Sequence, residues 1–227
     1  MMEVYMEEKP VNNKAIIPNI FLICYSIVKE ECFLMKHNKK DMIKESNFTY
    51  DDYASINDGN RYELVKGQLE LMSPSPSTIH QLILSELDFL ISLTCKTDYF
   101  ILFAPIDLIL SKNEVRQPDL ILISRQRIDI LTKRGVEGSP DLVVEILSPN
   151  SLKRDRIDKL KTYEQYEIPE YWIIDPTHQT LEQYHLVEGK YETLNVFQND
   201  ESVKSPTIKC ISFTMKQLMG NLPKLKD

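Results

Sequence analysis

One stretch of the sequence, Ser139–Ser148, reads SPDLVVEILS. It places the acidic side chain of Glu145 inside a run of aliphatic, largely β-branched residues. Such a run is typical of a buried strand. A buried carboxylate costs on the order of several kcal/mol unless it is paired or binds a cation. The stretch therefore predicts a central strand over Leu142–Leu147 that carries a functional acid.

A second acidic residue begins another apolar run. Residues 116–123 read RQPDLILI, which predicts a strand over Asp119–Ile123. A Pro-Asp pair alone is usually a turn, but two acids on buried strands together suggest a metal site. Magnesium favours one or two carboxylates, with water and substrate oxygens as its other ligands. We therefore expect Asp119 and Glu145 to bind Mg²⁺, or Mn²⁺ in its place, in a site that hydrolyses phosphodiesters.

The segment after the central strand supplies lysines for such a site. Asp155, Lys159 and Tyr163 are four residues apart, so they share one helix face. Lys161 lies about 200° around the helix from Lys159, so only one of the two lysines can face the site. We expect Lys159 to approach Glu145 and to stabilise charge or help activate water. The other basic residues are expected to face phosphate or solvent: Lys153, Arg154, Arg156 and Lys161.

The surrounding sequence alternates helices and strands. The first predicted elements are a short helix capped by Thr49, a hairpin over Arg61–Met72 with its turn at Lys66-Gly67, and a helix over Thr78–Cys95. A strand pair or bent strand over Tyr99–Leu110 follows, and after the two acid-bearing strands comes a helix over Leu152–Tyr166. The last predicted elements are a strand over Tyr171–Asp175, a hairpin over Leu181–Val196 and a short helix over Ile211–Met219. This order predicts an α/β (α+β) fold with a mixed central β-sheet flanked by helices. Residues 1–45 look different and are expected to be an N-terminal extension, either a real arm or a stretch upstream of the true start. Residues 46–227 are expected to form the domain.

Bulk properties exclude some classes of protein. The chain has 227 residues and a net charge of −7, which argues against a broad nucleic-acid-coating surface but leaves a nuclease open. The longest apolar stretch, residues 15–28, is interrupted by Pro18 and is shorter than the ~20 residues of a membrane span. We expect no membrane segment and a cytoplasmic protein. The cysteines form no CxxC pair and are expected to be free thiols: Cys24, Cys32, Cys95 and Cys210.

Two further polar residues allow more than one interpretation. His80 stands in the opening turn of the helix over Thr78–Cys95, where it either caps or packs, or else takes part in a site. Glu63 lies between Tyr62 and Leu64 in the first hairpin strand. Strand alternation places Glu63 opposite the apolar side, so we expect it to be exposed.

Several motifs follow one another in an order that resembles a known family. They are RYELVKGQLELMSP over Arg61–Pro74, His80-Gln81, Pro118-Asp119-Leu120, PDLVVEILSP over Pro140–Pro149, Lys159 with Tyr163, and IPEYWIIDP over Ile168–Pro176. From Phe48 to Leu218 the chain resembles the Uma-two family of restriction-endonuclease-like proteins, in the PD-(D/E)XK nuclease superfamily. The resemblance implies a restriction-endonuclease-like fold. Asp119 would be the acid of the PD element and Glu145 the acid of the (D/E)XK element.

The chain departs from the superfamily pattern at one position. Leu147 occupies the position two residues after Glu145, where the pattern has lysine. The family resemblance places the lysine in the following helix, which favours Lys159. It also adds Glu63 and His80 as further catalytic candidates.

The sequence and the resemblance together predict a magnesium-dependent DNA endonuclease. Its partner would be DNA, and we allow for a homodimer. Two alternatives stay open, because a fold does not fix a function. One is a non-catalytic module that binds nucleic acid or protein, and the other is a nuclease that acts on RNA.

Overall fold

The structure is a computed structural model that describes residues 47–72, 76–149 and 151–223. Residues 47–227 form one compact unit. The N-terminal extension expected over residues 1–45 lies outside the described residues. Among the helices that are described, none is both long and apolar enough to cross a membrane.

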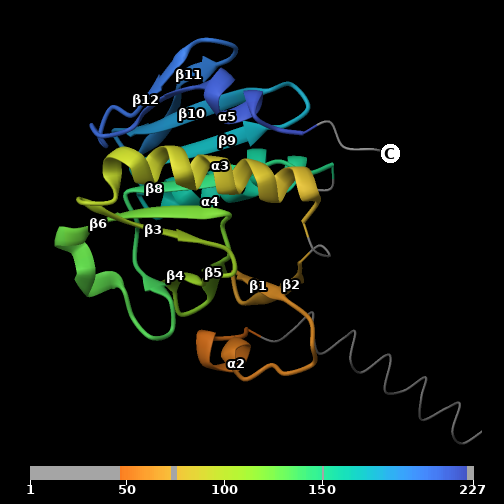
Figure 1. The fold of residues 1–227 in the computed structure, drawn as a ribbon. Coiled ribbons are helices and arrows are strands. Elements are labelled where there is room, and N and C mark those ends of the chain that lie inside the picture. Colours follow the sequence, from red (N-terminus) through yellow and green to blue (C-terminus); the bar gives the residue numbers. More distant parts are fainter. Residues whose placement is uncertain (1–46, 73–75, 150, 224–227) are drawn as a thin grey trace, which may run out of the picture. The chain divides into compact units, whose positions relative to one another are not determined.

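A mixed six-stranded sheet forms the centre of this unit (Figure 1). Its strand order is β11-β10-β9-β8-β6-β3. The strands span Tyr99–Phe103 (β3), Leu120–Ser124 (β6), Leu142–Ile146 (β8), Glu170–Asp175 (β9), Thr180–Val187 (β10) and Lys190–Phe197 (β11). Strands β8 and β9 are parallel, and the other neighbours are antiparallel.

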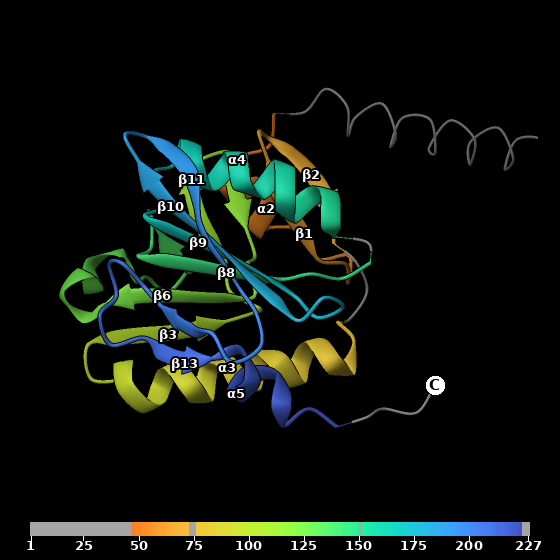
Figure 2. The same cartoon turned by 90° about the horizontal axis from the view of Figure 1, so that it is seen from above.

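Helices cover both faces of the six-stranded sheet (Figure 2). Helices α3 (Thr78–Cys95) and α5 (Met215–Gly220) lie on one face, and α4 (Leu160–Gln165) lies on the other. Val144 of β8 belongs to the core cluster that contains α3, whereas Val143 belongs to the cluster that contains Tyr163 of α4. Because side chains alternate along a strand, Glu145 points to the same face as Val143. The acid is thereby directed toward α4 and the segment before it.

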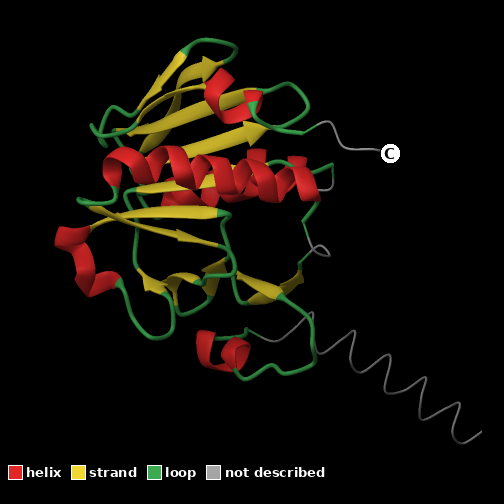
Figure 3. Ribbon diagram, in the orientation of Figure 1, coloured by secondary structure: helices red, strands yellow, loops and turns green. Residues whose placement is uncertain are grey.

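Smaller sheets and helices complete the unit (Figure 3). A five-stranded sheet has the order β2-β1-β5-β4-β7, and a two-stranded sheet pairs β12 with β13. These strands span Tyr62–Val65 (β1), Gln68–Leu71 (β2), Leu108–Ser111 (β4), Glu114–Arg116 (β5), Val136–Glu137 (β7), Ser202–Lys204 (β12) and Ser212–Thr214 (β13). The remaining helices are α2 (Tyr50–Ala54), the 3-10 helix η1 (Arg125–Ile130) and the π-helix η2 (Arg154–Lys159), which continues into α4. The predicted fold class, with its mixed sheet between helices, is confirmed.

Two predictions from sequence are wrong at the level of elements and bonds. The helix expected over Ile211–Met219 begins only at Met215, because residues 212–214 pair with β12 as a strand. The free-thiol expectation is wrong for Cys95 and Cys210, which form a disulfide with their Cα atoms 5.3 Å apart. Both cysteines belong to or pack against the core cluster around α3, and this packing brings them together across 115 residues of sequence.

Candidate active site

The two predicted metal-binding acids lie on neighbouring strands. In the antiparallel pair β6–β8, Leu120 is opposite Val144, so Asp119 and Glu145 come next to each other at the end of the register. The backbone N–H of Ile146 donates to Asp119 Oδ2 at 2.7 Å. The two carboxylates line the same cavity. The structure therefore brings both acids to one cavity, and their binding of a metal stays a prediction.

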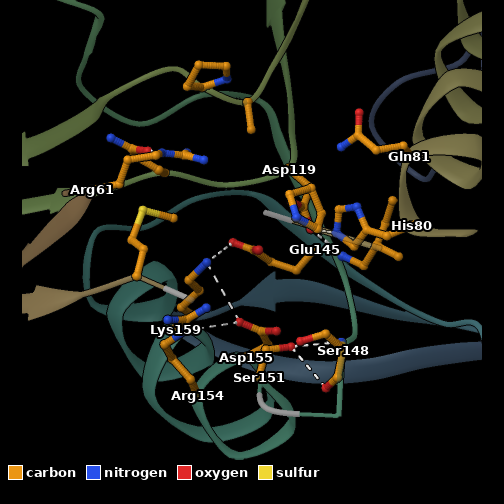
Figure 4. Close-up of a pocket in the computed structure, with 16 residues that line it drawn as sticks. Arg61, His80, Gln81, Asp119, Glu145, Ser148, Ser151, Arg154, Asp155 and Lys159 are labelled. Carbon is orange, nitrogen blue, oxygen red and sulfur yellow. Dashed lines mark hydrogen bonds and ion pairs between the residues drawn. The ribbon is translucent and has the colours of Figure 1, made fainter. Parts of the chain in front are cut away.

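Lys159 is the lysine that contacts Glu145. Its Nζ lies 2.7 Å from Glu145 Oε1 and 3.7 Å from Asp155 Oδ1 (Figure 4). The hydroxyl of Tyr163 donates to the same oxygen of Glu145 at 2.9 Å. Lys161 is exposed. The predicted shared face of Asp155, Lys159 and Tyr163 is confirmed, although the first two lie in a π-helix, a rare form often found at functional sites.

The predicted exposure of Glu63 is wrong. Its side chain is fully buried, and its carboxylate lies 3.4 Å from Lys159 Nζ and 3.4 Å from the guanidinium of Arg116. The backbone N–H of Gln117 also donates to it, at 3.0 Å. Strand β1 belongs to the five-stranded sheet, where Leu64 packs in a small apolar cluster while Glu63 faces the site. Both faces of β1 are covered, so alternation does not separate buried residues from exposed ones.

His80 contacts Asp119 from helix α3. The Nε2 atom of His80 lies 3.1 Å from Asp119 Oδ2. Ser77 caps the helix and accepts from the backbone N–H of His80, which fixes the start of α3 beside the cavity. The Nδ1 atom of His80 is buried without a hydrogen-bond partner among the described residues. His80 therefore combines the two interpretations left open by the sequence, because it packs at the helix start and also lies in the candidate site.

Six buried ionisable residues are joined by ion pairs beneath the cavity. We refer to them as the buried ion cluster: Glu63, Glu114, Arg116, Glu145, Asp155 and Lys159. Four carboxylates face two buried cations, and Arg154 adds a third positive charge 3.8 Å from Asp155 at the edge of the cluster, which leaves a formal excess of one negative charge. Sequence reasoning missed Glu114 and Arg116, because the three-residue strand β5 that carries them has no clear periodicity. A Glu-Val-Arg triplet before the Pro-Asp motif was the only available signal.

Burial and charge set the protonation preferences of this cluster. Burial, aided by the negative charges of Asp155 and Asp119, raises the pKa of Glu145 well above its ordinary value, although Lys159 opposes this. Burial also raises the pKa of Asp155. For Lys159, burial disfavours the charge, but the carboxylates of Glu145, Glu63 and Asp155 outweigh it and raise the pKa. Lys159 is thus kept protonated by the surrounding carboxylates, whereas burial favours the neutral form of Glu145 and Asp155.

The cavity above the cluster has a volume of about 400 Å³. Its wall includes the candidate residues His80, Asp119, Glu145 and Lys159, and it also includes Asp155. Six further polar residues also line the cavity, together with five apolar ones: Arg61, Gln81, Gln117, Ser148, Ser151 and Arg154 are the polar residues, and Met72, Pro76, Ala104, Pro105 and Ile146 the apolar ones. Carboxylates, a buried ammonium and guanidinium groups thus surround a space that is open to a ligand.

Comparisons with known proteins bear on the fold and on the family. A comparison with curated proteins gives no match. A crystal structure described as "a putative nuclease belonging to DUF820", from Anabaena variabilis ATCC 29413, shares the fold at 21% identity with a TM-score of 0.63, and the likeness covers 76% of this chain and 98% of that one. The model of the Uma2 family, described as "Putative restriction endonuclease", matches residues 49–216. This is the family that the sequence motifs resemble, and the chain belongs to it.

Proposed function

We propose that the protein is a divalent-metal-dependent endonuclease that hydrolyses phosphodiester bonds of DNA. The observation that carries this proposal is the meeting of Asp119, Glu145 and Lys159 at one cavity, from two neighbouring strands and the helix that follows them. Membership of a family described as endonucleases supports the reaction class. Asp119, Glu145 and Lys159 are the proposed catalytic residues, with Glu63 and His80 in supporting positions.

The residues at the cavity fit a divalent cation. Asp119 and Glu145 offer hard carboxylate oxygens, and the four carboxylates of the buried ion cluster outnumber their cations even when Arg154 is counted. Within the described residues, no group of three His, Cys, Asp or Glu side chains is arranged to hold an ion. Two carboxylates suffice for Mg²⁺, which usually keeps several waters. We propose that Asp119 and Glu145 hold the ion, which would polarise a phosphoryl oxygen and lower the pKa of bound water.

The protein's own residues supply charge and position. Lys159 keeps its proton at Nζ and can donate a hydrogen bond to a phosphoryl oxygen whose negative charge grows in the transition state. Glu63 and Asp155 hold the ammonium from two other sides, at 3.4 and 3.7 Å. His80 orients the carboxylate of Asp119 through its Nε2 contact. Arg116 holds Glu63 in turn, so it acts on Lys159 only through another residue.

A plasmid-cleavage assay with Mg²⁺ tests this proposal. We expect Asp119→Asn, Glu145→Gln and Lys159→Met each to slow cleavage by at least about 10²-fold, the usual loss when a group that stabilises transition-state charge is removed. Lys161→Met is the matched control, since it removes a lysine from the same helix at an exposed position. EDTA should stop cleavage by the parent protein.

Other outcomes separate the alternatives. Cleavage of an RNA transcript but not of the plasmid would make the protein a ribonuclease with the same site. Binding without cleavage of either substrate, under every divalent metal tried, would favour the non-catalytic module. Cleavage by all three variants at the parent rate would place the chemistry elsewhere.

A further inference from the structure

The four basic residues around η2 have different surroundings. Lys153 and Lys161 are exposed. Arg156 forms ion pairs with Asp175, at 3.3 Å, and with Glu182. Arg154 alone of the four lines the active-site cavity. The structure thus distinguishes one residue from a set that the sequence treats alike.

The guanidinium of Arg154 lacks hydrogen-bond partners within the described residues. Its Nε is buried and makes no hydrogen bond, and its nearest carboxylate oxygen, Asp155 Oδ1, is 3.8 Å away, which is too long for one. That oxygen of Asp155 is also buried without a hydrogen-bond partner. A buried donor left unsatisfied lowers stability, so such groups in native proteins call for an explanation.

Arg116 shows what a structural arginine at this site looks like. Its Nε donates to Glu114 at 2.8 Å, and its two terminal nitrogens contact Glu63 at 3.4 Å and Thr162 at 2.9 Å. Arg116 is 1% exposed and does not line the cavity. Arg154, in contrast, lines the cavity beside Lys159, and its terminal guanidinium nitrogens make no hydrogen bond to a described residue (Figure 4).

We infer that Arg154 binds a phosphate of the nucleic-acid backbone through its terminal guanidinium nitrogens. A planar guanidinium matches two non-bridging phosphate oxygens in a bidentate fashion. Arg154 and Lys159 come from the same π-helix and line one cavity, so the bound phosphate lies next to the proposed catalytic groups. This inference rests on the proposed function, since it assigns the substrate contact of that same site.

Binding of a short fluorescein-labelled DNA duplex, followed by anisotropy in EDTA and in Ca²⁺ at several salt concentrations, tests the inference. We expect Arg154→Gln to weaken binding about 10- to 100-fold, as for loss of hydrogen bonds to a charged group. The slope of log affinity against log salt should fall by about 0.9, the value for one phosphate contact. The Arg154→Lys variant should lose less affinity for the duplex than the Arg154→Gln variant. Thermal stability should fall only slightly, because the variant loses an ion pair that is 3.8 Å long but also loses a buried donor without a hydrogen bond.

Lys153→Gln is the matched control, since it removes one positive charge from the neighbouring, exposed position. It should leave affinity and salt slope almost unchanged. Equal weakening by both variants would mean a general electrostatic effect and would overturn the inference. Binding by Arg154→Gln that equals binding by the parent would also overturn the inference. A large fall in the melting temperature of this variant, with its affinity unchanged, would make Arg154 a structural residue and would overturn the inference as well. If the parent protein cleaves plasmid in these cases, the proposed function still stands; if the parent neither binds nor cleaves DNA, both fall.

Discussion

Glu63 keeps its charge in a fully buried position because two cations face it. Burial alone would raise the pKa of this carboxyl, but Lys159 and Arg116 reverse that effect and leave the pKa below its ordinary value of 4.5. A carboxyl with a lowered folded-state pKa adds stability above its unfolded pKa. That stability is lost as the pH falls through the folded pKa. Glu63 should thus support the fold near neutral pH and not in strong acid.

The difference in the free energy of unfolding between the parent and the Glu63→Gln variant isolates the contribution of this charge. We expect the variant to be less stable than the parent at pH 7, because Lys159 and Arg116 each lose a charged partner. The gap should narrow as the pH falls below about 4.5, where the unfolded carboxyl takes up its proton. Urea unfolding at a series of pH values measures it. A gap that is constant with pH, or that widens in acid, would show that the charge of Glu63 contributes no stability.

The sequence predicts the place of some site residues and not of others. Glu145 and Asp119 stand out because an acid beside a long apolar run needs a physical reason. Lys159 follows from helix spacing. Glu63 and Arg116 could not be placed this way, since their burial arises from packing between β1, β5 and the helix after β8, which brings together residues 46 to 96 positions apart in sequence. The alternation of apolar and polar residues along one strand does not predict contacts between residues so far apart in sequence.

At the scale of elements, length and capping decide what the sequence predicts. Helix α3 has 18 residues and a capping serine, and its predicted bounds agree with the structure. The turn at Lys66-Gly67 has both residues at positive φ, as the hairpin prediction requires. The strands β5 and β12 have three residues each and were not predicted, because so short a run shows no reliable period. Their pairing partners, rather than their own composition, make them strands.

The disulfide joins the long helix α3 to the turn before the short strand β13. Cys95 ends α3, and Cys210 precedes β13. Closing a loop of 115 residues should stabilise the fold by up to about 4–5 kcal/mol through the entropy of the unfolded chain. We therefore expect a reductant to lower the free energy of unfolding in urea. Cleavage should persist under native conditions, because His80 lies 15 residues away along α3, or about 22 Å.

The control for this prediction is the Cys95→Ala/Cys210→Ala double variant. Its stability should be lower than that of the oxidised parent and should not respond to the reductant. A parent protein whose stability is equal with and without reductant would contradict the prediction. Mass spectrometry after alkylation of free thiols would show whether the bond forms at all.

At the scale of the whole molecule, the described unit contains every residue of the proposed mechanism. Residues 47–227 form one compact unit, and the family match spans residues 49–216. The six-stranded sheet brings the acids together, and the smaller sheet adds Glu63 and Arg116. We therefore propose that residues 46–227 are the nuclease-like domain and that residues 1–45 are an extension to it.

Deletion of residues 1–41 tests this division. We expect the shortened protein to fold with the same melting temperature and to cleave plasmid at the parent rate, since the compact unit over residues 47–227 and the family match over residues 49–216 both lie beyond the deletion. Deletion of residues 1–54 is the contrasting control, because it removes α2. Tyr53 in that helix donates a hydrogen bond to Asp107 and accepts one from Gln117, which lines the cavity. The longer deletion should lower both stability and cleavage. If the shorter deletion is equally harmful, or yields only insoluble protein, residues 1–41 contribute to the fold and the proposed domain boundary is wrong.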